Sequence, residues 1–298
     1  MKICTLCPRN CAVDRKAGET GVCGQTDEIK VARAALHYWE EPCISGKEGS
    51  GAVFFSGCSL HCVFCQNRSI ANGTAGKTIS MGRLIDIFLE LQEKGANNIN
   101  LVTASHFVPQ VAAALIKAKE LGLHIPIVYN TGGYETVENI RRLEGLVDIY
   151  LPDFKYMDEA LSFKYSHAGD YAKVAKEALK EMVRQTGPAE FLGGDEEGLM
   201  KKGVIVRHLL LPECMEDSKR IIKYLYETYG NGIYISIMNQ FTPLSGLEQY
   251  PELNRRISAE EYDEVVDYAI ALGVECGFIQ EGETAEESFI PEFDGEGV

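Results

Sequence analysis

The sequence predicts an α/β fold, a partial (β/α)6 barrel that carries a Cys-rich N-terminal extension. Six short apolar runs are spread through the middle of the chain, and amphipathic helical patterns lie between most of them. Four cysteines are concentrated before Gly24, ahead of these runs. Repeated β–α units imply a parallel sheet with right-handed crossovers. A doubly wound sheet fits the same pattern, because six units are two short of a closed eight-stranded barrel.

The predicted strands are continuous apolar runs, as expected for parallel strands that are covered on both faces. In chain order they are AVFFSG from Ala52, NINLVTAS from Asn98, IPIVYNTGG from Ile125, VDIYLPDFK from Val147, GVIVRHLLLP from Gly203 and IYISIMNQFTP from Ile233. The clearest predicted helix starts after Ser80, a good N-cap residue, and stops before Gly95. Further helical patterns cover residues 108–121, 214–229 and 259–272, and residues 158–202 are expected to hold helices and a loop.

We divide the chain into a Cys-rich extension (1–50), a barrel (51–273) and an acidic tail (274–298). The net charge of −15 argues against nucleic-acid and membrane partners, because an acidic protein repels phosphate backbones and anionic lipids. No Lys or Arg follows Arg256, so the tail is expected to be a solvated surface or a docking face for a basic partner protein. Ten cysteines without a signal-like start predict thiols or metal ligands in the reducing cytoplasm rather than disulfides.

The stretch GCSLHCVFCQN places Cys58, Cys62 and Cys65 in one loop directly after the first predicted strand. A cubane iron–sulfur cluster has four irons, so three thiolates leave one iron open for a small molecule. The sequence therefore predicts a cluster with an open iron at the functional edge of the sheet. The alternative is a zinc site that a distant residue such as His61 or Cys43 completes.

The C-x3-C-x2-C spacing, with the aromatic Phe64 before its last cysteine, resembles the signature of radical S-adenosylmethionine enzymes. The longer string EEPCISGKEGSGAVFFSGCSLHCVFCQN resembles the subgroup related to pyruvate formate-lyase activating enzyme. This resemblance implies that Cys58, Cys62 and Cys65 are catalytic residues that hold a [4Fe-4S] cluster, whose fourth iron S-adenosylmethionine chelates. One electron would then cleave the sulfonium and give a 5′-deoxyadenosyl radical for hydrogen abstraction. Phe64 would shield the cluster or stack on the adenine.

The resemblance also implies cofactor-binding positions at the ends of other strands. The family often has a Gly-Gly-Glu stretch that contacts the amino group of S-adenosylmethionine. TASH stands there in this chain, so Thr103, Ser105 and His106 would have to substitute. The string DFK places Asp153 and Lys155 where activating enzymes point an acid and a lysine into the site. A local ion pair is the alternative for these two residues.

Two further positions carry over from the resemblance. Arg207, after GVIV, matches a basic position that would meet the carboxylate of S-adenosylmethionine or neutralise cluster charge, and a structural clamp is the alternative. Asn130 and Thr131 stand where activating enzymes have an Asp-Thr pair near a monovalent cation. The asparagine weakens that site, and a simple turn is the alternative.

A second cysteine group lies at the N-terminus with the spacing C-x2-C-x3-C-x11-C and consists of Cys4, Cys7, Cys11 and Cys23. A structural zinc ion or a second iron–sulfur cluster fits this spacing, and unmetallated thiols are the alternative. The lone cysteines, expected to be small buried apolar residues, are Cys43, Cys214 and Cys276.

The predicted function is that of a radical S-adenosylmethionine oxidoreductase. By resemblance, its substrate would be a backbone glycine of a glycyl-radical protein, and a flavodoxin or ferredoxin would supply the electron. One alternative keeps this chemistry on another peptide or a small metabolite. The other is a non-catalytic iron–sulfur or zinc electron-transfer protein, which should ignore S-adenosylmethionine.

Overall fold

One sheet organises the protein, whose computed structural model describes residues 3–194, 198–280 and 291–298. The strand order is β10-β9-β8-β6-β5-β4-β2-β1-β3, and β7 pairs with β8 off this path. The strands are β1 (Lys30–His37), β2 (Ser50–Phe55), β3 (Lys77–Thr78), β4 (Ile99–Val102), β5 (Ile127–Thr131), β6 (Ile149–Pro152), β7 (Glu190–Phe191), β8 (Met200–Leu209), β9 (Tyr234–Met238) and β10 (Gly277–Ile279).

The six predicted strands form β2, β4, β5, β6, β8 and β9, and neighbours in this series pair in parallel. The α/β fold with a mainly parallel sheet is therefore confirmed, and it is consistent with a partial barrel. The sheet also crosses both predicted section boundaries. Strand β1 pairs antiparallel with β2 from within the Cys-rich section, and β10 adds a parallel strand beside β9 from within the acidic section. The three-section division itself stays a prediction.

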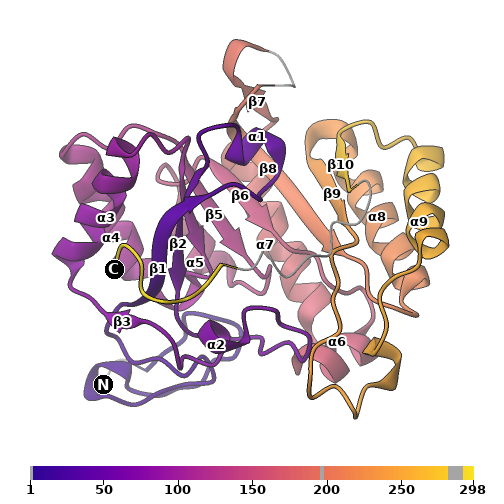
Figure 1. Cartoon of the computed structure of the whole chain (residues 1–298), viewed down its shortest axis with the longest axis horizontal. Helices are drawn as coiled ribbons and strands as arrows, with labels where there is room; N and C mark the ends of the chain where they lie inside the picture. The colour runs from indigo at the N-terminus through magenta and orange to yellow at the C-terminus, as the bar shows by residue number, and fades with distance from the viewer. Residues whose placement is uncertain (1–2, 195–197, 281–290) are drawn as a thin grey trace.

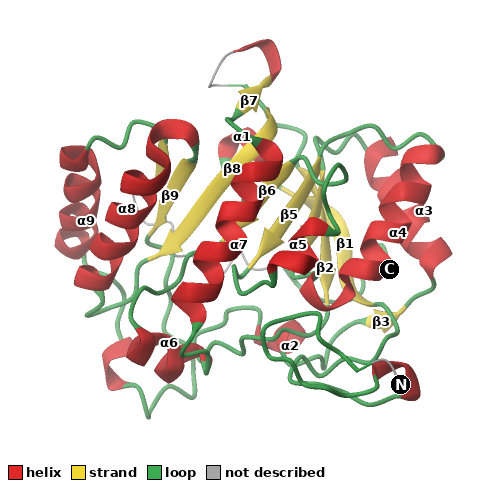
Figure 2. Cartoon of the chain, turned by 180° about the vertical axis from the view of Figure 1, so that it is seen from behind, coloured by secondary structure: helices red, strands yellow, loops and turns green. Residues whose placement is uncertain are grey.

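The helices flank the sheet (Figures 1 and 2). Helices α3 and α4 lie at one end, α8 and α9 at the other, and α5 and α7 cover the face that is turned to the viewer in Figure 2. Short 3-10 turns occur at Arg15–Ala17, Ser105–Phe107, Leu192–Gly194, Gly230–Gly232 and Pro251–Leu253. The α-helices are α1 (Pro42–Ser45), α2 (Arg68–Ala71), α3 (Met81–Glu93), α4 (Val108–Glu120), α5 (Val137–Arg141), α6 (Glu159–Ser166), α7 (Tyr171–Thr186), α8 (Met215–Tyr229) and α9 (Ala259–Leu272).

Helix α3 shows how local sequence sets these elements. The Ser80 hydroxyl accepts from the Arg83 amide at 3.1 Å, which satisfies one of the free N–H groups of the first turn. Gly95 follows the helix with a φ of 85°, a conformation that glycine adopts without strain. Both predicted boundary residues therefore act as expected.

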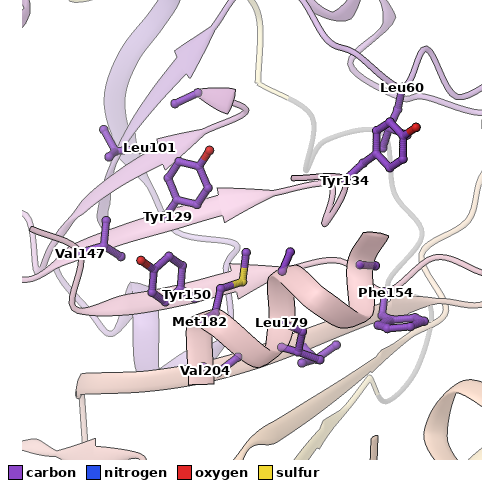
Figure 3. Close-up of a cluster of buried hydrophobic side chains, with 14 of the residues drawn as sticks. Leu60, Leu101, Tyr129, Tyr134, Val147, Tyr150, Phe154, Leu179, Met182 and Val204 are labelled. Atoms are coloured by element: carbon purple, nitrogen blue, oxygen red, sulfur yellow. The ribbon is translucent and has the colours of Figure 1, made fainter. Parts of the chain in front are cut away.

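Helix α7 packs on the outer face of β6 and β8. Tyr150 of β6 and Met182 of α7 are fully buried in this layer, and Tyr129 of the neighbouring β5 packs edge-to-face on Tyr150 with ring centroids 6.1 Å apart (Figure 3). The Tyr150 hydroxyl donates to Gln185 at 2.5 Å, so the buried phenol has a partner on the helix. This packing holds the ends of both strands in place at the cavity described below. In the part of the chain that the structure describes, no helix combines the length and apolarity needed to cross a membrane.

Candidate active site

A cavity of about 270 Å³ lies where the parallel strands end. Its walls come from the loop after β2 and from the ends of β4, β5, β6, β8 and β9. Site residues predicted from sequence line it from five of these places, namely Cys58, Cys62, Phe64, Cys65, Thr103, Ser105, Asn130, Asp153, Lys155 and Arg207. Side chains that lie up to about 150 positions apart in sequence thus meet around one space.

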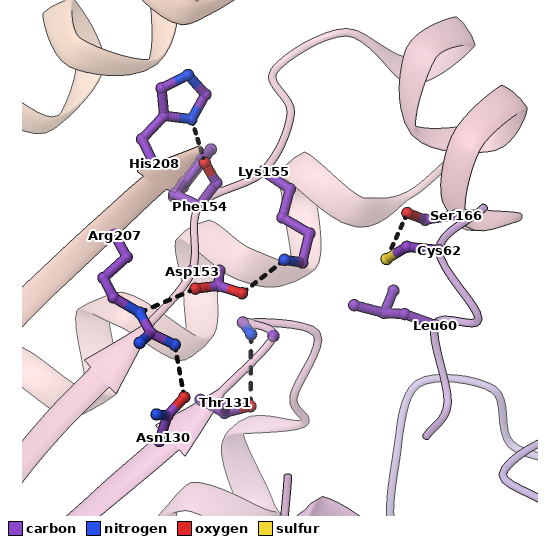
Figure 4. Close-up of polar contacts among 12 residues, drawn as sticks. Leu60, Cys62, Asn130, Thr131, Asp153, Phe154, Lys155, Ser166, Arg207 and His208 are labelled. Atoms are coloured by element: carbon purple, nitrogen blue, oxygen red, sulfur yellow. Dashed lines mark hydrogen bonds and ion pairs between the residues drawn. The ribbon is translucent and has the colours of Figure 1, made fainter. Parts of the chain in front are cut away.

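Two sulfur atoms of the cysteine loop accept hydrogen bonds, one from the loop itself and one from α6. The Leu60 amide donates to Cys58 Sγ at 3.4 Å, and the Ser166 hydroxyl donates to Cys62 Sγ at 3.0 Å (Figure 4). The Cys65 amide donates to the Cys62 carbonyl at 3.0 Å, which closes the turn between these two cysteines. Donors to sulfur stabilise its negative charge and tune the potential of a cluster that the sulfur binds.

Two of these thiols, Cys62 and Cys65, are poor candidates for free nucleophiles. Burial raises the pKa of Cys65 to about 12. Burial also raises the pKa of Cys62, although the nearby Lys155 opposes this effect. A buried thiolate needs a positive partner, and coordinated iron supplies one. The environment therefore suits cysteines that ligate a metal group.

The donor set fits a three-thiolate cluster. Among the described residues, no three His, Cys, Asp or Glu side chains gather closely enough to hold a single ion. A cubane does not require that arrangement, because each thiolate binds a different iron. The two suggested zinc partners are engaged elsewhere. His61 Nε2 lies 2.6 Å from the Val22 carbonyl oxygen, and Cys43 is buried in α1 within a separate apolar cluster.

A charged network forms another wall of the cavity (Figure 4). Arg207 donates to Asp153 at 3.2 Å, to Glu40 at 3.0 Å and to Asn130 at 2.6 Å. Lys155 Nζ lies 2.5 Å from the second oxygen of Asp153. The ion pair and the clamp that the sequence left open as alternatives are therefore both present, and the same residues also line the cavity.

The network keeps Asp153 and Arg207 charged. Burial alone would raise the pKa of Asp153, but Lys155 and Arg207 outweigh it and lower that pKa below its usual value. For Arg207 the opposing carboxylates of Asp153 and Glu40 outweigh burial and raise its pKa. The cavity wall thus presents fixed positive and negative charges to a bound molecule.

Only part of the TASH segment after β4 reaches the cavity, since Thr103 and Ser105 line it and His106 does not. Thr103 lines the cavity with a φ of 60°, which is unusual for a β-branched residue. The Ser105 hydroxyl donates to Glu135, a fully buried carboxylate. His106 is buried outside the cavity lining, and its Nε2 lies 2.7 Å from the Ser56 carbonyl oxygen. In this structure His106 is therefore not placed to contact a molecule in the cavity.

Sequence reasoning missed Trp39 and Glu40, which line the cavity from the segment after β1. Glu40 also accepts from Asn100 at 3.0 Å and so joins three strands through its carboxylate. Strand β1 was not predicted, so nothing placed the following YWEE string at the site. Two adjacent glutamates, Glu40 and Glu41, directly follow the only tryptophan of the sequence. This combination is the signal that could have marked the segment as a candidate part of the site.

The N-terminal cysteines Cys4, Cys7, Cys11 and Cys23 do not line this cavity. They lie in the loops that precede β1, on the side of the molecule where the β2 loop and α2 are found (Figure 1). The two cysteine groups are therefore separate sites within one region.

Comparison with known proteins agrees with the cysteine loop. The Radical SAM superfamily model matches residues 52–225. The uncharacterized protein MJ0674 of Methanocaldococcus jannaschii is 29% identical over 279 residues, which cover 90% of this chain and 74% of that protein.

Solved structures share the fold. Streptococcus suis SuiB bound to S-adenosylmethionine has a TM-score of 0.53 at 16% identity, over 76% of this chain and 49% of SuiB. HydG, a maturase of the [FeFe]-hydrogenase, has a TM-score of 0.50 at 15% identity, over 80% of this chain and 53% of HydG. The chain thus spans about half the length of each. Because the family model covers more than half of the chain and includes the three-cysteine loop, the protein belongs to the radical SAM superfamily, which implies a [4Fe-4S] cluster and S-adenosylmethionine.

Proposed function

We propose that the protein is an enzyme that cleaves S-adenosylmethionine reductively at a [4Fe-4S] cluster held by Cys58, Cys62 and Cys65. The observation that carries this proposal is that the three thiols of one loop line the same cavity as the Asp153–Arg207 ion pair. When bound, the cluster and S-adenosylmethionine supply a 5′-deoxyadenosyl radical for hydrogen abstraction. An electron carrier has no need of a charged cavity beside its cluster.

The residues of the chain hold, orient and shield this cofactor pair. Ser166 and the Leu60 amide donate to the sulfur ligands. Arg207 and Lys155 bring positive charge to the cavity wall, where the carboxylate of S-adenosylmethionine finds a partner. Phe64 packs edge-to-face against Tyr165 and Phe241 and keeps water away from the loop.

We further propose that the substrate is a backbone glycine of a partner protein. The long string around the cysteine loop, which resembles glycyl-radical activating enzymes, supports this proposal. A flavodoxin or ferredoxin is the proposed electron donor, and the cytoplasm the proposed compartment.

Electron paramagnetic resonance tests the first proposal. The protein is reconstituted anaerobically with iron and sulfide, reduced, and measured with and without S-adenosylmethionine, while 5′-deoxyadenosine is quantified. We expect a cluster signal that changes when S-adenosylmethionine is added, and product formation. Cys58→Ala should reduce product to background, whereas Cys276→Ala, outside both cysteine groups, should not. A signal indifferent to S-adenosylmethionine, or zinc without iron, would contradict the proposal.

Isotope transfer tests the substrate. A glycyl-radical protein of the host is labelled with deuterated glycine and incubated with the reduced enzyme and S-adenosylmethionine. We expect deuterium in 5′-deoxyadenosine and an organic radical signal on the partner. Cleavage of S-adenosylmethionine without deuterium transfer from any such partner would direct the search to other peptides or small metabolites.

A further inference from the structure

The N-terminal cysteines are close neighbours of one another. The Ala12 amide, next to Cys11, donates to the Cys4 carbonyl at 3.2 Å, and the Val22 amide, next to Cys23, donates to Cys11 Sγ at 3.3 Å. The Cys4 amide donates to the Val13 carbonyl at 2.9 Å, so the chain doubles back on itself at this group. All four are free thiols. The sequence spacing is therefore realised as one cluster of thiols in space.

This cysteine group has the surroundings of a ligand set. Cys7 and Cys23 are buried, so two of the four sulfur atoms are shielded from solvent. A Cβ atom on Gly21 would lie 2.9 Å from Cys11 Sγ, and the Val22 amide donates to that sulfur at 3.3 Å. A tight glycine turn that brings an amide onto a cysteine sulfur is what a bound cluster uses to stabilise its charge.

The same loops press against the cysteine loop of the cavity. A Cβ atom on Gly57, the residue before Cys58, would lie 2.6 Å from the Cys23 carbonyl oxygen. His61, the residue before Cys62, has its Nε2 atom 2.6 Å from the Val22 carbonyl oxygen. Backbone next to one cysteine group therefore touches backbone and side chain next to the other.

Arg9 clamps the two loops together. Its Nε atom donates to the Ser59 carbonyl at 2.8 Å, and its Nη2 atom donates to the Ser166 carbonyl at 2.9 Å. Its guanidinium also lies over the Tyr134 ring at 5.3 Å. Arg9 comes from between Cys7 and Cys11, and Ser166 donates to Cys62. One side chain thus fixes both cysteine groups in a single arrangement.

We infer that Cys4, Cys7, Cys11 and Cys23 hold a second [4Fe-4S] cluster, which passes electrons to the cluster at Cys58, Cys62 and Cys65. Zinc has no redox chemistry, so zinc at this site would exclude the electron-transfer role. As in the cavity loop, a cubane fits thiols that are not gathered for a single ion in the described chain, because each binds its own iron. The role rests on the proposed function. A one-electron donor protein reduces the outer cluster from the 2+ to the 1+ state, and the outer cluster returns to 2+ as the inner one becomes 1+.

Metal analysis of full-length variants tests the site separately from catalysis. Iron, sulfide and zinc are measured in reconstituted wild type, in the Cys58→Ser/Cys62→Ser/Cys65→Ser variant and in Cys7→Ser/Cys11→Ser, with Cys276→Ser as control and circular dichroism to check folding. We expect about eight irons in wild type and control, and about four in each multiple variant. Zinc, or no metal, in the folded triple variant would overturn the second cluster and leave the proposed function standing.

Spin interaction tests the electron contact. Two reduced clusters held in contacting loops should broaden each other's paramagnetic resonance signals, so the wild-type spectrum should differ from the sum of the two variant spectra. Arg9→Gln should keep all the iron but shift the spectrum toward that simple sum, because it loosens the clamp. A wild-type spectrum equal to the sum would overturn the electron-transfer role even if the second cluster is present.

Discussion

Arg207 is the cation that pairs with both Glu40 and Asp153 on the cavity wall. Its guanidinium contacts Glu40 from the segment after β1, Asp153 after β6 and Asn130 on β5. The ionised residues are largely buried, with side-chain exposures of 16% for Arg207, 8% for Glu40 and 17% for Asp153. Removal of the arginine leaves the carboxylates of Glu40 and Asp153 without the cation that they share, which is costly for buried charges.

Arg207→Gln should therefore lower the free energy of unfolding by about 3 kcal/mol, in the range for broken buried ion pairs. Urea denaturation of the metal-free protein measures this change. Arg142→Gln is the matched control, because its pair with Glu138 is exposed at 44% and 76% and should contribute no more than about 0.5 kcal/mol. Equal effects of the two substitutions would show that the network adds nothing beyond a surface pair.

His208, the next residue along β8, should make stability depend on pH. Its Nδ1 atom lies 2.8 Å from the Phe154 carbonyl oxygen and its Nε2 atom 2.8 Å from the Ser218 hydroxyl. Burial lowers its pKa to about 4. Between about pH 6.5 and 4 the unfolded chain binds a proton at this histidine that the folded protein does not. Stability should therefore fall as the pH falls through this window, by about 3 kcal/mol in all.

Urea midpoints of wild type and His208→Gln, taken at several pH values, check this prediction. The glutamine can keep one donor and one acceptor but cannot titrate, so its pH slope should be smaller by about one proton. Other buried histidines such as His106 will keep part of the slope in both proteins, because burial lowers the pKa of His106 to about 3. Parallel pH curves would show that His208 is not the group responsible.

At the scale of elements, the turn between β5 and α5 joins two strand ends of the site. The Tyr171 hydroxyl, at the start of α7, lies 2.8 and 2.9 Å from the carbonyl oxygens of Gly132 and Asp153, which share its one proton, and it accepts from the Lys155 amide at 3.0 Å. Gly133 must fit under this junction. Its φ is 78°, and a Cβ atom there would lie 2.2 Å from the Asp153 carbonyl oxygen.

Gly133→Ala should therefore cost more than the ordinary penalty for a left-handed alanine. Gly145 is the matched control, because its φ is 75° but a Cβ atom there meets nothing within 4 Å. We expect about 1 kcal/mol for Gly145→Ala from backbone strain alone, and about 1–3 kcal/mol more for Gly133→Ala from the forced backbone shift. Denaturation curves of both variants measure the difference. Equal losses of unfolding free energy in the two variants would mean that the backbone at Asp153, directly after β6, shifts to accommodate the alanine without a measurable penalty.

The elements that sequence predicted well have strong local signals. The apolar runs of β2, β4, β5, β6, β8 and β9 are bounded by polar turns, and Ser80 caps α3 where expected. Strand β1 was missed because its sequence KVARAALH is rich in alanine and charged residues, and its burial comes from pairing with β2 and β3. Strand β10 has only three residues, too few for any pattern. Both depend on long-range pairing that no local window contains.

At the scale of the whole molecule, the contrast between local signals and long-range contacts also explains which site residues could be predicted from sequence. Residues at the ends of predicted strands were found because parallel strands end at one edge. Glu40 and Trp39 reach the cavity from the segment after the antiparallel strand β1. The rule that functional residues follow the ends of parallel strands therefore does not predict them. The sequence predicted Ser105 as a site residue. It did not predict the hydrogen bond from Ser105 to Glu135, because Glu135 lies thirty positions further along the chain. Motifs identify chemistry, whereas the supporting contacts emerge only from the fold.

The segment 291–298 bears on the question of what the acidic end of the chain does. Pro291 lines the cavity, and Arg33 of β1 forms ion pairs with Asp294 and Glu296. The Ala34 amide on the free edge of β1 donates to the Glu296 carbonyl at 2.9 Å. The carboxylates of Asp294 and Glu296 are thus paired within the chain, and the segment covers a strand edge that would otherwise be open (Figure 1).

Phe293 anchors this cover, since its ring meets Phe54, itself part of the cavity wall, edge-to-face at 5.4 Å. Phe293→Ala should lower the free energy of unfolding by about 1–2 kcal/mol, because the ring is only partly buried. It should also speed amide hydrogen exchange in β1, above all at Ala34, whose partner is on the released segment. Phe163→Ala on α6 is the control, because Phe163 is 66% exposed and should change neither quantity. If β1 exchanges at the same rate in both variants, the segment is held by its ion pairs alone, and the cavity wall does not depend on the aromatic contact.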